Sequence, residues 1–140
     1  MRVLGLIVAL AIILAGMLMG GSLMAFVNAP SILVVVGCAQ GVLAALYGFD
    51  SVRIFTPGFS HQNPERGIRI AESGSHLYIM AGWVGAGIGW IQIGQYLGNL
   101  SSLGPAFAVS VLTIFYGYCA HFLVWYPIKA KLAEVVAEQK

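Results

Sequence analysis

Residues 106–126 read AFAVSVLTIFYGYCAHFLVWY, and these 21 consecutive positions contain no Asp, Glu, Lys or Arg. An α-helix of this length extends over about 32 Å, because each residue adds about 1.5 Å. The hydrocarbon core of a bilayer is roughly 30 Å thick. An uncharged stretch of this length is therefore typical of a membrane-spanning helix.

Three more stretches have the same character, namely residues 3–26, 32–49 and 76–97. The chain has 140 residues, of which 59% are hydrophobic and 9% are charged, whereas soluble domains contain about 25% charged residues. The first stretch could instead be a signal peptide, but it exceeds the roughly 7–15 apolar residues of such a peptide, so we favour a retained span. We predict an all-α, polytopic membrane protein of one domain, residues 1–140, with four transmembrane helices.

The charged residues support this topology, because four spans place all of them on one side of the membrane. The connecting segments 27–31 and 98–105 contain no charge. The basic residues lie at the N-terminus, in the loop 50–75 and in the tail 127–140: Arg2, Arg53, Arg66, Arg69, Lys129, Lys131 and Lys140. By the positive-inside rule, we expect both termini and this loop in the cytoplasm, with the chain in the inner (plasma) membrane.

The loop 50–75 contains the signals of a short helix. Asn63 is a suitable N-cap and Pro64 suits the first helical position, so we predict an interfacial helix over Pro64–Ser73 that ends at Gly74. The tail is expected to continue as helix, with a kink at Pro127. Four basic residues are predicted to anchor these segments to anionic lipid headgroups, with docking of a partner as the alternative: Arg66, Arg69, Lys129 and Lys131.

Small residues recur at helical spacing in the predicted spans, and in lipid such faces let helix backbones approach closely. Eight glycines are predicted to serve helix packing: Gly16, Gly20, Gly37, Gly41, Gly82, Gly85, Gly89 and Gly117. This pattern predicts a tight bundle or an oligomer and does not distinguish between them.

The stretch 106–126 also contains a polar stripe, since Ser110, Thr113, Gly117 and His121 follow steps of three and four residues and share one helical face. Hydroxyls in a span can bond to the backbone one turn back, in which case the stripe serves packing. Polar groups deep in lipid also mark ion pathways. Likewise, His121 is either a proton-linked group or a simple hydrogen-bond donor to a neighbouring helix.

No carboxylate lies inside any predicted span, although an ion-driven membrane protein needs a group that binds and releases the ion. Either the chain conducts no ion, or a partner supplies the acid. We expect no enzymatic activity, because no pairing of a nucleophile with a base is evident, and no metal or cofactor. Cys38 and Cys119 form no CxxC motif, and the net charge of +2 is too small and dispersed to indicate nucleic-acid binding.

Four segments resemble the MotA/TolQ/ExbB-type family, and most of all its MotA-type flagellar stator subunits. Residues 20–37 (GGSLMAFVNAPSILVVVG) resemble the signature around the first outer turn, and residues 82–91 (GWVGAGIGWI) resemble the third-span pattern. Residues 103–117 (LGPAFAVSVLTIFYG) are similar to the start of the fourth span, and residues 127–132 (PIKAKL) to its exit.

The resemblance implies a homo-oligomer, a pentamer, around a single-span MotB/ExbD-like partner that carries the membrane aspartate. Ion flow through such a complex drives its rotation. The residues that the resemblance and the polar stripe together place on the ion pathway are Ala86, Ser110, Thr113, Ile114 and His121.

The chain departs from the family pattern in ways that keep a second hypothesis open. The large cytoplasmic domain of flagellar stators is missing, Ile79 stands where the family usually has proline, and Ile114 replaces a hydroxyl residue. Fewer hydroxyls leave fewer ligands for a partly dehydrated ion. The alternative is a non-conducting oligomeric membrane scaffold that keeps the stator fold. A small proton-coupled exporter is disfavoured, because residues 3–26 contain no acid.

Overall fold

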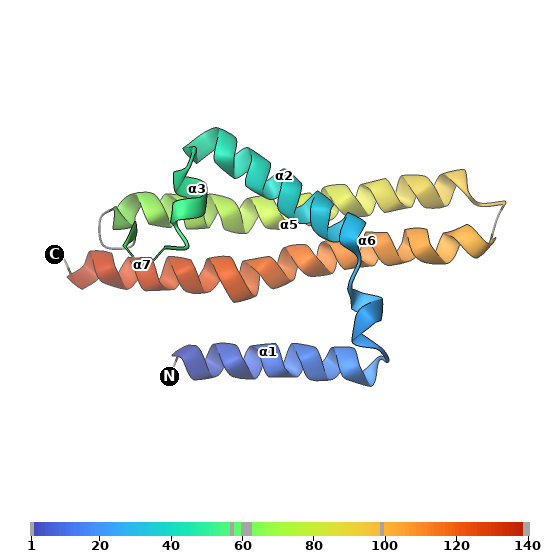
Figure 1. Ribbon diagram of the computed structural model, residues 1–140, viewed down its shortest axis with the longest axis horizontal. Helices are drawn as coiled ribbons and strands as arrows, with labels where there is room; N and C mark the ends of the chain where they lie inside the picture. The colour runs from blue at the N-terminus through green and yellow to red at the C-terminus, as the bar shows by residue number, and fades with distance from the viewer. Residues whose placement is uncertain (1, 57, 60–62, 99, 139–140) are drawn as a thin grey trace.

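The computed structural model describes residues 2–56, 58–59, 63–98 and 100–138, and all the regular secondary structure in these ranges is helical. Two long helical segments form an antiparallel hairpin, a shorter helix crosses it, and the N-terminal helix lies apart (Figure 1). In chain order the elements are α1 (Arg2–Met19), η1 (Leu23–Phe26), α2 (Ala29–Tyr47), α3 (Asp50–Arg53), α5 (Pro64–Gln95), α6 (Leu100–Ala120), the π-helical segment η2 (His121–Trp125) and α7 (Tyr126–Glu138).

Three helical segments are long and apolar enough to cross a membrane, namely Leu23–Tyr47, Pro64–Gln95 and Ser101–Glu138. The apolar part of α1, Leu4–Met19, is shorter. The expected helix over residues 3–26 is therefore wrong in its extent. Gly20 and Gly21 interrupt it, since Gly21 has a φ of 131°, in the region that favours glycine. A short 3₁₀-helix follows.

The start of α2 is held by side-chain hydrogen bonds. Asn28 is the N-cap, and its Oδ1 accepts hydrogen bonds from the backbone N–H and the hydroxyl of Ser31, both at 3.0 Å. The Tyr116 hydroxyl accepts a hydrogen bond from the Asn28 backbone N–H at 3.0 Å and donates one to the Phe26 carbonyl. These bonds attach the connection between α1 and α2 to the C-terminal part of α6.

The predicted interfacial helix is also longer than expected. It begins at Pro64 as predicted, with Asn63 as N-cap, but the Asn63 side chain makes no capping hydrogen bond and the helix runs without a break to Gln95. Gly74 does not end it. A Cβ at Gly74 would lie 2.7 Å from three ring carbons of Trp125, so this glycine is a packing position inside α5.

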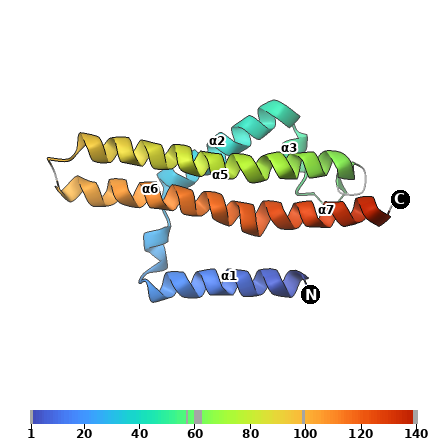
Figure 2. The same cartoon turned by 180° about the vertical axis from the view of Figure 1, so that it is seen from behind.

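The second arm of the hairpin is a single long helical segment, residues 100–138, that runs antiparallel to α5 (Figure 2). The predicted connection 98–105 is shorter than expected, because α6 already begins at Leu100 and contains Pro105. The tail continues as helix to Glu138, as predicted. Next to Pro127 the backbone forms a π-helical turn, in which the Tyr126 N–H bonds to the His121 carbonyl five residues back. Proline lacks the N–H of a regular α-helical bond, which accounts for the irregular turn.

The core lies where α2 crosses the hairpin and at the end of the hairpin next to the chain termini. Its buried members are small or aliphatic residues together with three aromatic residues: Val35, Ala39, Leu43, Ile54, Phe59, Ile70, Ala71, Tyr78, Ala81, Trp125 and Leu132. The ring of Trp125, 1% exposed, lies 5.5 Å from that of Phe55 and 5.6 Å from that of Tyr78, measured between centroids. Most other large apolar side chains point outward, as expected of helices solvated by lipid.

Candidate functional site

The polar stripe of α6 faces α5 along a seam of close backbone contact. A Cβ at Gly85 would lie 2.6 Å from Cγ2 of Thr113, and one at Gly82 would lie 2.8 Å from the Thr113 carbonyl. Gly89 meets Ser110 in the same way, and a Cβ at Gly117 would lie 2.6 Å from the Tyr78 carbonyl. We call this contact the glycine seam: Gly82, Gly85 and Gly89 on α5 against Ser110, Thr113 and Gly117 on α6.

The two hydroxyls of the glycine seam bond to their own helix. Ser110 donates to the Ala106 carbonyl at 3.1 Å, and Thr113 lies 3.0 Å from the carbonyls of both Val109 and Ser110. Ser110 is 2% exposed and Thr113 is 0% exposed. Each hydroxyl proton is therefore used within α6, while the oxygen lone pairs remain available to a ligand only if α5 and α6 separate.

The other predicted pathway residues surround this seam. Ala86 is fully buried, next to the seam in sequence. Ile114 is half-buried, and its Cα would be 3.3 Å from a Cβ at Gly82. The structure therefore brings Ser110, Thr113 and Ile114 of α6 against the small residues of α5.

His121 lies beyond the seam, in the π-helical segment. Its Nδ1 is 2.5 Å from the Ser75 hydroxyl of α5, and its ring lies edge-on to Phe122 with centroids 4.9 Å apart. His121 is half-buried. Its ring therefore forms a hydrogen bond across the hairpin and is also partly exposed at the surface of the helices. Ser75 was not predicted as a site residue, since only the register between two distant segments brings it to His121.

The remaining predicted packing glycines have different surroundings. Gly16, Gly37 and Gly41 have no heavy atom within 4 Å of a built Cβ, so their faces are open in the single chain. Gly20 approaches its own helix and, at 3.9 Å, the ring of Phe26. Two further glycines of α5 were missed as packing positions: Gly67 lies against Leu132 and Gly74 against Trp125. Their seven-residue spacing was a signal in the sequence, but the expected helix end at Gly74 obscured it.

Two of the four predicted headgroup anchors form ion pairs within the chain. Arg66 Nε lies 2.9 Å from Asp50 Oδ2, and Lys129 Nζ lies 2.9 Å from Glu72 Oε1. The hydrogen bond and the positive charge of Lys129 lower the pKa of Glu72 below its usual 4.5. Arg69 and Lys131 are exposed. Within the described ranges, no group of three or more His, Cys, Asp or Glu side chains is placed to hold a metal ion.

Together these features define the class of the molecule as an all-helical protein with three segments able to cross a membrane and a closely packed, weakly polar helical hairpin. Comparison of the chain with protein-family models, and with curated proteins, finds no match.

Proposed function

We propose that this chain is the membrane subunit of a stator-like complex driven by an ion-motive force. It forms an oligomer around a single-span partner, and the partner carries the membrane aspartate. The observation that carries the proposal is the chemistry of the hairpin: residues 76–126 contain no Asp, Glu, Lys or Arg, and their buried hydroxyl residues include Ser110 and Thr113 of the glycine seam. Such a hairpin can line a pathway but needs an acid from another chain to bind the ion.

The proposed topology has four spans, with α1 as the first. The 18 residues of α1 extend over about 27 Å, close to the thickness of the bilayer core. Both chain termini and the segment around α3 lie at the same end of the helices (Figure 1). The charged residues belong to these parts of the chain, so the positive-inside rule assigns this end to the cytoplasm of a bacterial cell.

The proposed oligomer would cover faces that are open in the single chain. Gly37 and Gly41 lie on an exposed face of α2 beside Leu33, which is 73% exposed. α1 contacts the rest of the chain mainly through η1, and both views show it apart from the hairpin (Figures 1 and 2). Small residues on open faces favour packing against another helix in lipid. The number of copies in the proposed oligomer, five, and the single-span partner are taken from the resemblance to stator subunits.

The test is to co-express the chain with the single-span membrane proteins encoded beside it and to weigh the purified complex by native mass spectrometry. Five copies with a partner that carries a membrane aspartate are the expected result. Proton flux into vesicles should then disappear when that aspartate is replaced by Asn. A homo-oligomer of any size that purifies without such a partner would overturn the proposal.

One observation favours the alternative of a non-conducting scaffold. Both hydroxyls of the glycine seam already bond to their own backbone and are buried against α5, and Ile114 adds an apolar group where a hydroxyl would be useful to an ion. A scaffold of this kind would assemble normally, show no proton flux, and keep its cellular function when Thr113 is replaced by Val.

A further inference from the structure

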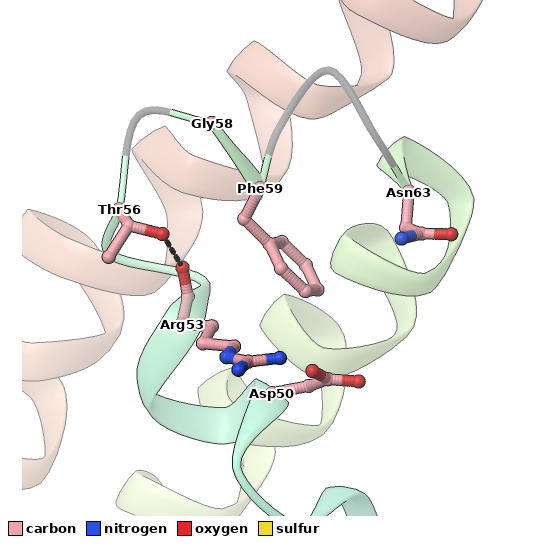
Figure 3. A pocket seen from close by; sticks show the side chains of 6 residues that line it. All are labelled: Asp50, Arg53, Thr56, Gly58, Phe59 and Asn63. Atoms are coloured by element: carbon pink, nitrogen blue, oxygen red, sulfur yellow. Dashed lines mark hydrogen bonds between the residues drawn. The ribbon is translucent and has the colours of Figure 1, made fainter.

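A polar pocket of about 430 Å³ lies between α3 and the start of α5. Its lining residues are Asp50, Arg53, Thr56, Gly58, Phe59 and Asn63 (Figure 3). Phe59 is 7% exposed and forms an apolar wall, while the side chains of Asp50 and Arg53 extend from α3 below it. The pocket has no role in the proposed ion pathway, which lies along the glycine seam.

The charged side chains that line this pocket include one cation without an ion-pair partner among the described residues. Arg66 Nε binds Asp50 at 2.9 Å, so the one carboxylate of the pocket already has a partner. Arg53 is exposed and forms no ion pair with any carboxylate of the described residues. The Asp50 carboxylate is thus engaged by Arg66, which leaves the Arg53 guanidinium, the cation among the lining residues, available to a ligand.

The neutral groups of the pocket also suit an anion. The Asn63 side chain makes no capping hydrogen bond, so its amide N–H groups can serve a ligand. Asn63 also precedes the first turn of α5, whose backbone N–H groups have no acceptor within the helix and carry partial positive charge. Thr56 donates its proton to the Arg53 carbonyl at 2.6 Å, which holds the backbone of Arg53 in place.

The surroundings of the pocket distinguish a lipid from a soluble anion. Three apolar side chains next to it in sequence project outward, Phe49, Val52 and Phe55, with exposed fractions of 87%, 58% and 52%. α3 begins three residues after α2 ends at Tyr47, so the pocket lies where an apolar helix leaves the proposed bilayer. A ligand with a phosphate and an acyl chain satisfies both Arg53 and these side chains, because guanidinium groups bind phosphate through paired hydrogen bonds.

We propose that this pocket binds the phosphate group of an anionic phospholipid, with Arg53 as its principal cation and Phe49, Val52 and Phe55 in contact with the acyl chains. This lipid site is separate from the proposed stator function. The proposal predicts that the protein prefers anionic over zwitterionic lipid at one defined position. The tail of the chain and the glycine seam take no part in it.

The test measures binding of phosphatidylglycerol, phosphatidylcholine and inorganic phosphate to the detergent-purified full-length protein by native mass spectrometry. The wild-type protein should bind phosphatidylglycerol more tightly than phosphatidylcholine. Arg53→Gln should weaken phosphatidylglycerol binding about tenfold or more, as expected for one charge-assisted contact. Arg69→Gln is the comparison, because it removes the same charge at a predicted headgroup contact that does not line the pocket, and it should weaken phosphatidylglycerol binding less than Arg53→Gln does.

A second variant changes affinity in the opposite direction. Asp50→Asn removes the one carboxylate among the described lining residues and should tighten phosphatidylglycerol binding in protein whose circular dichroism shows an intact fold, whereas weaker binding by such protein would count against the proposal. Equal losses in Arg53→Gln and Arg69→Gln would overturn the proposal, because general surface charge would then explain the preference. Inorganic phosphate that binds as tightly as the lipid would overturn the lipid assignment. Neither result depends on a partner or on ion flux, so the stator proposal is tested separately.

Discussion

Gly74 of α5 lies directly against the indole ring of Trp125, which is the last residue of the π-helical segment η2. A Cβ at Gly74 would be 2.7 Å from three carbons of that ring, and the ring itself is 1% exposed between Phe55 and Tyr78. The position permits no side chain, because an indole packed on several sides cannot move away.

We therefore expect Gly74→Ala to destabilise the protein by about 1–3 kcal/mol, the usual cost of overpacking. Thermal unfolding in detergent, followed by circular dichroism, measures the loss. Gly94→Ala is the control in the same helix, since a Cβ there meets nothing within 4 Å. It should be neutral or slightly stabilising, because alanine favours helix. Equal effects of the two substitutions would show that the contact with Trp125 does not matter.

Tyr116→Phe should loosen the connection between α1 and α2. The hydroxyl bridges the Asn28 N–H and the Phe26 carbonyl, and its removal leaves both backbone groups without this partner. An unsatisfied buried group costs about 1–3 kcal/mol, and these partly buried groups should lie at the lower end. Limited proteolysis should cut faster near residues 20–28. Tyr118→Phe serves as control, because the Tyr118 ring stacks on Phe122 and is 39% exposed.

The ion pair of Glu72 with Lys129 should be visible in a titration of the Glu72 carboxyl carbon by NMR. The hydrogen bond and charge of Lys129 lower the pKa of Glu72 below 4.5, so Lys129→Gln should raise the midpoint. A lowered pKa in the folded state adds stability above the unfolded-state pKa, and this stability is lost as the pH falls through the folded-state pKa. The contribution should be small and weakened by salt, because the pair is solvent-exposed. An unchanged midpoint would exclude the pair.

Thr113→Val separates the two proposed functions. The Thr113 hydroxyl donates to carbonyls of its own helix, so its removal should change stability by no more than about 1 kcal/mol. In a conducting complex the substitution should reduce proton flux, and Thr113→Ser, which keeps the hydroxyl, should retain it. Normal flux in Thr113→Val would exclude this hydroxyl from the ion pathway.

Local patterns predicted much of the hairpin. The spacing of Gly82, Gly85 and Gly89 indicated one packing face, and the uncharged stretch 106–126 indicated its partner helix. The bounds of the elements were less accurate. The first helix ends early, at Met19, where Gly20 and Gly21 follow. In contrast, α5 continues through Gly74, and the tertiary contact of Gly74 with Trp125 accounts for a glycine at that position.

Pairings between distant segments could not be predicted from the sequence. Ser75 and His121 are separated by 46 positions, and Asp50 of α3 pairs with Arg66 of a different helix, α5. No local propensity encodes such a register. The charge of Arg53 was evident in the sequence, but its position in a pocket without an ion-pair partner depended on where Arg66 and Asp50 meet.

The π-helical turn His121–Trp125 sets the rotational phase between the two parts of the long second arm. Each residue of an α-helix rotates the chain by about 100°, and the turn accommodates one extra residue. If the same residues formed a regular α-helix, α7 would be rotated by about that angle relative to α6. Leu132 would turn away from Gly67 and Lys129 from Glu72, while the glycine seam stayed in place. The hairpin thus consists of two contact zones whose mutual alignment depends on a single turn.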